Sequence, residues 1–136
     1  MVKRFEELDH TADVAIRAYG RTPSELFANA AAGMFSLIAD LDTVQAKGEV
    51  RVEVTGSDLP NTLFRFLSEL LFVHETQHIL LKEFDVAVEG FHVRATVRGE
   101  AMDRARHELL LNVKAVTYHN MSLDLEKGEA TVVFDI

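Results

Sequence analysis

The sequence predicts an α+β fold in a single domain covering residues 1–136, with two long helices on one side of a mixed, mainly antiparallel sheet of about six strands. Two segments carry apolar residues at helical spacing, and several others alternate apolar and polar residues. Most alternating segments follow one another through short polar turns, as in antiparallel sheets. The 136 residues, 48% of them hydrophobic, suffice for one packed core without cysteines, of which there are none.

The first strand and the first helix are expected between residues 14 and 41. Apolar residues alternate from Val14 to Ala18, and Gly20 ends the run. The sequence T-P-S-E at residues 22–25 is a capping box with proline at the first helical position, so a helix should begin at Pro23. Its apolar residues recur at steps of three and four and form one buried stripe: Leu26, Ala30, Met34, Leu37, Ile38 and Leu41.

A second strand and a second helix follow. Residues 49–54 alternate charged residues with valine, which predicts a strand with one solvated face. Ser57 or Asp58 should cap a helix that carries Pro60 in its first turn and runs to about Thr76. The apolar side chains of this segment share one helical face, which comprises Leu63, Phe66, Leu67, Leu70 and Leu71.

The second half of the chain is expected to be mainly β. Residues 84–88 and 91–97 alternate on either side of a two-residue polar turn and predict an antiparallel hairpin. Residues 101–110 are charged and show neither period, which indicates a loop. Two further strands are expected in residues 113–125 and 129–136, joined by a short turn that contains glycine.

The charge of the chain argues against strong direct binding to nucleic acid. The net charge is −8 and the pI is near 5.2, so the overall field should repel a phosphate backbone. Four arginines could form a local basic patch, but acidic residues are interleaved with them. The patch would contain Arg94, Arg98, Arg104 and Arg106, with Glu100, Asp103 and Glu108 among them. We therefore expect weak or no direct RNA binding.

Neither export nor membrane insertion is expected. The polar N-terminal residues lack the pattern of a secretion signal. The longest strongly apolar stretch, residues 59–73, is interrupted by Arg65 and Glu69 and is shorter than the ~20 apolar residues that cross a bilayer. The absence of cysteine also suits a reducing cytosol. These observations favour a cytoplasmic protein.

One short motif points to a different function. His74, Glu75 and His78 form the pattern H-E-x-x-H, in which two histidines on one helical face bind zinc and the glutamate acts as general base. The motif falls at the expected end of the second helix, and no third zinc ligand is evident. An exposed helix end with histidines near the negative end of the helix dipole is the competing interpretation. A zinc hydrolase remains an alternative prediction.

Two sequence blocks and the C-terminus carry a family resemblance. Residues 9–14 read D-H-T-A-D-V, residues 113–119 read V-K-A-V-T-Y-H, and the chain ends in Asp135 and Ile136. With these blocks in this order and at this length, the whole sequence resembles the archease family. Ala15 is a departure from the pattern, because archeases often carry glycine after this valine.

The resemblance implies an accessory protein and not an enzyme. Archeases assist a GTP-dependent RNA ligase that joins tRNA exons during tRNA splicing. They promote guanylylation of the ligase, so that it turns over many times. The resemblance also implies assistance to a tRNA methyltransferase, which corresponds to a chaperone-like role. A chaperone for proteins or RNA modification that needs no metal is therefore a further alternative.

The resemblance also implies a metal site, made of the side chains of Asp13 and Asp135 and the free carboxylate of Ile136. All three supply hard oxygen donors, which favour calcium, with magnesium or manganese as alternatives, over zinc. Asp13 could instead accept hydrogen bonds in a turn, and Asp135 could lie in a frayed terminus. The alternating residues before Asp135 predict that the terminus is held in a strand.

Four further residues accompany this site in the sequence. Lys114 interrupts an apolar run and could either balance the acidic site or extend its amine from the sheet to solvent. His10 and His119 are candidate hydrogen-bond partners of the site. Tyr118 is expected to pack in the core with its hydroxyl at the edge.

Overall fold

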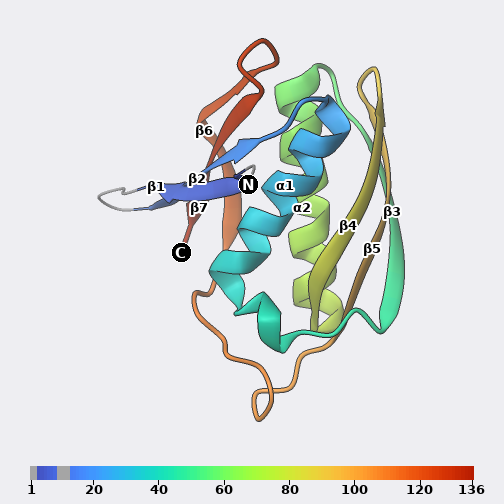
Figure 1. Cartoon of the computed structure of the whole chain (residues 1–136), viewed down its shortest axis with the longest axis vertical. Coiled ribbons are helices and arrows are strands. Elements are labelled where there is room, and N and C mark those ends of the chain that lie inside the picture. Colours follow the sequence, from blue (N-terminus) through green and yellow to red (C-terminus); the bar gives the residue numbers. More distant parts are fainter. Residues whose placement is uncertain (1–2, 9–12) are drawn as a thin grey trace.

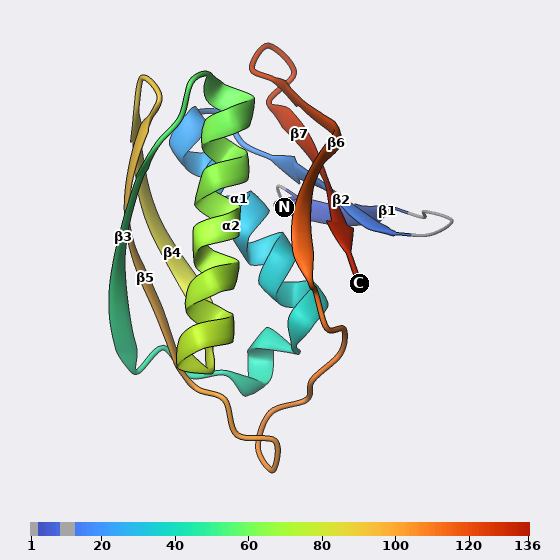
Figure 2. The same ribbon diagram turned by 180° about the vertical axis from the view of Figure 1, so that it is seen from behind.

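The computed structural model describes residues 3–8 and 13–136 and confirms the α+β class with two long helices. The helices, α1 (Pro23–Ile38) and α2 (Leu59–Gln77), lie between two sheets, and each helix contacts strands of both (Figures 1 and 2). This arrangement differs from the expected single sheet with helices on one side. In the described residues no helix is long and apolar enough to span a membrane.

Both sheets are antiparallel throughout the described residues, with seven strands where about six were expected. The four-stranded sheet has the order β1-β2-β7-β6, with β1 at Phe5–Leu8, β2 at Val14–Tyr19, β7 at Glu129–Asp135 and β6 at Ala115–Asp124. The three-stranded sheet has the order β3-β5-β4, with β3 at Gly48–Thr55, β5 at His92–Ala101 and β4 at Ile79–Glu89.

The helix starts agree with the capping residues in the sequence. Thr22 caps α1 and its hydroxyl accepts a hydrogen bond from the backbone N–H of Glu25 at 3.1 Å. Asp58 caps α2 and accepts from the N–H of Asn61 at 2.8 Å. Helix α1 ends at Ile38, before the end of its apolar stripe, because Ala39 is extended and bridges the distant loop.

The middle layer explains why α1 is apolar on nearly all sides. Residues 30–33 read A-A-A-G and are all buried, because α1 packs against β2 on one side and β4 on the other. At Gly33 a Cβ atom would lie 2.7 Å from Cδ1 of Ile16, so the first sheet approaches α1 too closely for a side chain. Phe27 of α1 and Phe66 of α2 stack at 6.0 Å between the two sheets.

Candidate metal-binding site at the C-terminal strand

The two candidate aspartates lie on neighbouring strands. Val14 of β2 pairs with Phe134 of β7 in antiparallel register, and Asp13 and Asp135 are the next residues outward on the two segments. Val14 and Phe134 face the core, and side chains alternate between the two faces of a sheet. Asp13 and Asp135 therefore share the opposite face of the sheet. The fold thus places Asp13 and Asp135 at the same end of one sheet, and their joint binding of a metal stays a prediction.

The C-terminus is held in place, as the sequence predicted. Strand β7 continues to Asp135, and Phe134 is completely buried. The backbone N–H of Lys114 donates a hydrogen bond to the carbonyl of Asp135 at 2.8 Å. Ile136, whose side chain lies largely in solvent, follows directly. Ile136 is therefore attached to an ordered strand, next to Asp135.

Lys114 lies at the same end of the sheet. Ala115 pairs with Asp135 in the β6–β7 register, so the preceding residue Lys114 stands opposite Ile136. Its side chain is exposed. Its predicted role of balancing the acidic groups stays a prediction, because no ion pair joins it to a described acidic residue and alternation starts its side chain on the other face of the sheet from Asp135.

His119 and Tyr118 lie elsewhere on β6. Thr117 pairs with Val133 and Ser122 with Thr131, so residues 118–121 form a bulge opposite a single residue of β7. The exposed His119 lies inside this bulge, further along β6 than the end that carries Lys114. The prediction that Tyr118 packs in the core is wrong, because it is 45% exposed and contacts Phe64 at the surface. His10 lies outside the described residues.

The donor set fits a hard divalent cation in its chemistry. Asp13, Asp135 and the carboxylate of Ile136 all present anionic oxygen atoms, as calcium, magnesium and manganese prefer. Within residues 3–8 and 13–136, no three side chains of His, Cys, Asp or Glu are grouped as metal ligands. The carboxylate of Ile136 as the third ligand stays a prediction.

The H-E-x-x-H motif does not lie on one helical face. Helix α2 ends at Gln77, and His78 is its C-cap with left-handed backbone angles of φ 55° and ψ 47°. Nδ1 of His74 donates a hydrogen bond to the carbonyl of Ile79 at 2.7 Å, and its ring packs edge-on against Phe35. His74 therefore helps to join α2 to β4, and the geometry gives the zinc hydrolase no support.

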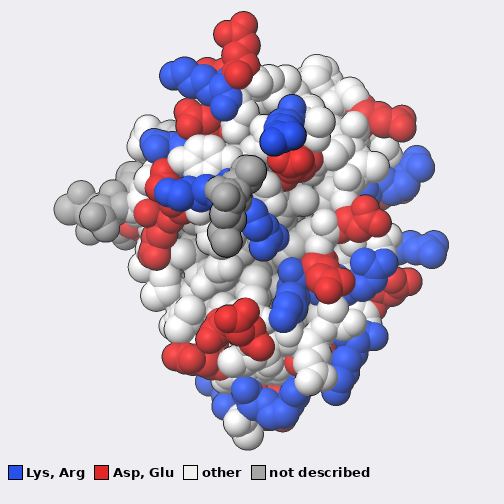
Figure 3. Space-filling view, in the orientation of Figure 1, with Lys and Arg blue, Asp and Glu red and all other residues white. Residues whose placement is uncertain are grey.

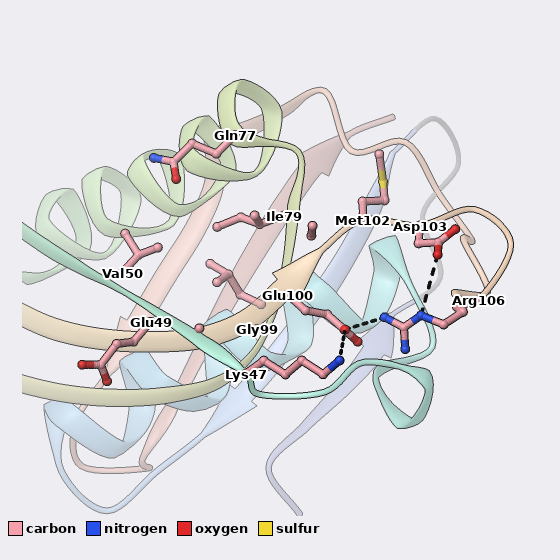
Figure 4. Close-up of a pocket in the computed structure, with 13 residues that line it drawn as sticks. Lys47, Glu49, Val50, Gln77, Ile79, Gly99, Glu100, Met102, Asp103 and Arg106 are labelled. Carbon is pink, nitrogen blue, oxygen red and sulfur yellow. Dashed lines mark hydrogen bonds and ion pairs between the residues drawn. The ribbon is translucent and has the colours of Figure 1, made fainter.

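A buried polar cluster that sequence reasoning missed lies around Glu100, at the end of β5. The Glu100 carboxylate is 5% exposed and accepts hydrogen bonds from Nε2 of His107 at 2.9 Å and from the backbone N–H of Gln45 at 2.7 Å. Arg106 bonds its other oxygen, and Lys47 lies 4.0 Å away (Figure 4). The cluster therefore joins the loop after β5 to the segment before β3.

This cluster strongly favours the ionised form of Glu100. The hydrogen bond from His107, followed by that from Gln45, lowers the pKa of Glu100 to about 2, against the opposing effect of burial. The carboxylate borders a cavity of about 610 Å³, whose apolar wall includes Ile79 and Met102. Because its oxygen atoms are already hydrogen-bonded within the chain, we assign Glu100 a structural role.

Three of the four arginines of the expected basic patch lie beside acidic side chains. Arg98 pairs with Glu49 at 3.3 Å, Arg94 lies 4.0 Å from Glu53, and Arg106 bonds Glu100. In the space-filling view, basic and acidic side chains are intermingled over the visible face (Figure 3). This distribution agrees with the expected weak direct binding of RNA, which stays a prediction.

Comparisons with known proteins agree with the resemblance. Residues 5–136 match the model of the archease protein family (MTH1598/TM1083). The chain is 44% identical to a protein archease of Methanopyrus kandleri, with 91% of each chain covered. It is 40% identical to a protein archease of Methanothermobacter thermautotrophicus, with 99% of this chain and 100% of that one covered.

Two solved structures share the fold. The solution structure of Methanobacterium thermoautotrophicum protein 1598 matches with a TM-score of 0.84 and 38% identity, over 99% of this chain and 100% of that one. A crystal structure from Thermotoga maritima, described as an archease and possible chaperone, matches with a TM-score of 0.59 and 19% identity over 96% of each chain. The family match over nearly the whole sequence, with relatives above 30% identity, shows that this chain belongs to the archease family.

Proposed function

We propose that this protein is an accessory factor that activates a GTP-dependent RNA ligase of tRNA splicing, by promoting its guanylylation and multiple turnover. The observation that supports the proposal is the register of β2 and β7, which puts Asp13 at the same end of the sheet as Asp135 and Ile136. Membership of the archease family supports the same role. A cytoplasmic location fits a cysteine-free chain, in which no disulfide can form.

The acidic site would hold a divalent cation, calcium before magnesium or manganese. Asp13, Asp135 and the carboxylate of Ile136 would be its ligands, and the bound ion would offset their clustered charge and offer a positive centre to a partner's anionic groups. Contacts within this chain hold the end of β7, and with it Asp135, in position. Buried Phe134 anchors the strand, and the hydrogen bond between Lys114 and Asp135 holds its end. Lys114 would limit the net negative charge.

The test is multiple-turnover RNA joining by the cognate ligase with GTP and a chosen divalent cation. We expect Asp13→Asn and Asp135→Asn to lower activation about tenfold or more, because each removes an anionic ligand and keeps the side-chain volume. Asp85→Asn is the matched control, since Asp85 is an exposed aspartate on β4, in the other sheet. Circular dichroism checks that all variants fold.

The outcomes separate the alternatives. Full activation by both site variants would rule out the metal-dependent role and favour a metal-independent chaperone; the Thermotoga protein is described as a possible chaperone. A chaperone role would show as reduced aggregation of a tRNA methyltransferase in the presence of wild type and of both variants alike. No stimulation of the ligase by the wild-type protein would refute the proposed function itself.

A further inference from the structure

Strand β3 is an open edge of the three-stranded sheet. It pairs with β5 on one side, and no strand of the described residues pairs with its other side (Figure 2). Eight residues, Gly48–Thr55, present this edge without proline and without a bulge. Open edges of this kind are templates for strand pairing, and monomeric proteins usually block them.

The other edge strands of the protein are blocked. In β4 a bulge interrupts the register between Leu81 and Glu83. The outward N–H of Val88 donates a hydrogen bond to the hydroxyl of Ser24 at 2.9 Å, so it is not free to pair with another strand. Strand β6 carries the bulge at residues 118–121, and β1 is only four residues long. Among the described strands, β3 thus differs in offering a long regular edge.

The free hydrogen-bonding groups of β3 can be assigned. The N–H of Gly56 donates to the carbonyl of Phe91 at 2.9 Å, which identifies Gly56 and Phe91 as a hydrogen-bonded pair. Such pairs alternate along an antiparallel strand, so every second residue of β3 directs its N–H and C=O groups to the open edge. These residues are Glu49, Arg51, Glu53 and Thr55.

We propose that a second copy of this chain pairs with this edge, antiparallel, about a two-fold axis at Val52. In this register Arg51 of each copy stands opposite Glu53 of the other, and the two three-stranded sheets join into one continuous sheet. Glu49 then faces Thr55. Arg51 is available for this pairing, because it stands opposite the neutral Thr96 within its own sheet and forms no ion pair with a described residue.

Charge also disfavours the neighbouring registers. A two-fold axis at Arg51 would oppose Arg51 to itself and Glu49 to Glu53, and like charges directly opposite each other are destabilising. An axis at Glu53 would oppose Glu53 to itself. An axis at Val50 would set Glu49 opposite Arg51, which is favourable, but only residues 48–52 of the two β3 strands would then pair. The register at Val52 combines opposite charges with nearly the full length of β3.

The groove beside the edge supplies apolar surface for the same contact. Val54 of β3, Phe64 and Phe72 of α2 line a cavity of about 600 Å³ between the strand and the helix. The side chain of Phe72 is 58% exposed, whereas that of Phe64 is half-buried. Because the two-fold axis is perpendicular to the plane of the joined sheet, both copies place α2 on the same face of that sheet. The second copy would therefore cover Phe72 and the groove.

The test measures the dimer dissociation constant of the full chain by sedimentation equilibrium or light scattering over a dilution series. We expect Arg51→Glu and Glu53→Arg each to raise this constant about tenfold or more, because two-fold symmetry introduces each repulsion twice. An equimolar mixture of the two variants should form heterodimers, since one copy then presents two acidic side chains at positions 51 and 53 and the other presents two basic ones. The double variant Arg51→Glu/Glu53→Arg should dimerise like wild type.

The matched control is Asp85→Arg, which reverses an acidic charge as Glu53→Arg does, on the same face of the sheet but on β4, the far edge strand. It should leave the dissociation constant within about twofold, because β4 does not meet the second copy. The mixture also distinguishes repulsion from misfolding, because two misfolded variants would not form a heterodimer. A wild-type protein that stays monomeric at the highest soluble concentration would overturn the proposal, as would dimers that Arg51→Glu and Glu53→Arg leave unchanged.

Discussion

Nε2 of His107 donates a hydrogen bond to the Glu100 carboxylate, while Nδ1 of the same ring accepts one from the backbone N–H of Asp103, both at 2.9 Å. The imidazole is therefore neutral with its proton on Nε2, because a protonated ring could not accept from Asp103. The pair connects the end of β5 to the loop that follows it. This loop in turn caps the end of α1, because the backbone N–H groups of Leu110 and Leu111 donate hydrogen bonds to the carbonyls of Ile38 and Leu37.

Replacing Glu100 should remove part of the pH dependence of stability, because the ionised carboxylate stabilises the fold. The folded pKa of Glu100 is about 2, below its ordinary value of 4.5. Its contribution to stability is therefore present above pH 4.5 and is lost as the pH falls towards 2. We expect Glu100→Gln to lower Tm at neutral pH, with the difference from wild type shrinking over this window. Thermal unfolding followed by circular dichroism measures it, with exposed Glu83→Gln as control. An equal difference at every pH would contradict the assignment.

Gly99→Ala should destabilise the fold severely. A Cβ atom at Gly99 would lie 1.7 Å from the carbonyl oxygen of Leu80, a backbone atom that cannot move aside without breaking the β4–β5 pairing. The expected loss is about 3 kcal/mol or more in the free energy of unfolding. At Gly48, its partner in register, the nearest atom is 3.9 Å away, so Gly48→Ala should cost about 0.5 kcal/mol or less. Urea unfolding of the two variants compares them, and similar losses would refute the steric argument.

The two histidines of the H-E-x-x-H motif should affect stability in opposite directions. His74→Ala removes the hydrogen bond to Ile79 and the contact with Phe35, at an expected cost of about 1–3 kcal/mol. His78→Gly places glycine at a left-handed C-cap, which should be neutral or stabilising by about 1 kcal/mol. Denaturant unfolding gives both values. Zinc that copurifies with wild type and is lost from both variants would contradict this structural assignment.

A C-terminal tag should weaken metal binding without unfolding the protein. The tag converts the carboxylate of Ile136 into a neutral amide and adds bulk beside Asp135, whereas the buried Phe134 still anchors β7. We expect calcium affinity to fall about tenfold or more, on the scale of losing one charged ligand. Calorimetric titration of untagged, C-terminally tagged and N-terminally tagged proteins measures it. Equal affinities would remove the terminal carboxylate from the site.

Local patterns in the sequence located most of the elements. The capping residues Thr22 and Asp58 determined where the helices begin, because the first N–H groups of a helix need acceptors nearby in the chain. Alternation located most of the strands, since side chains on a strand point to opposite faces. The four-residue β1 was missed because F-E-E-L is too short to show a period.

Tertiary structure decided how these elements combine. Alternation shows that a strand has one apolar face but does not show which sheet it joins, so one sheet was expected where two enclose the helices. The β2–β7 register puts Asp13 and Asp135 at the same end of one sheet, and this register depends on pairing between the two ends of the chain. The family resemblance identified these two residues as candidates, whereas the periodicity of the sequence could not have shown that they belong to the same sheet. Glu100 and His107 lie in segments without periodicity, and only the packing of the loop shows that they are buried partners.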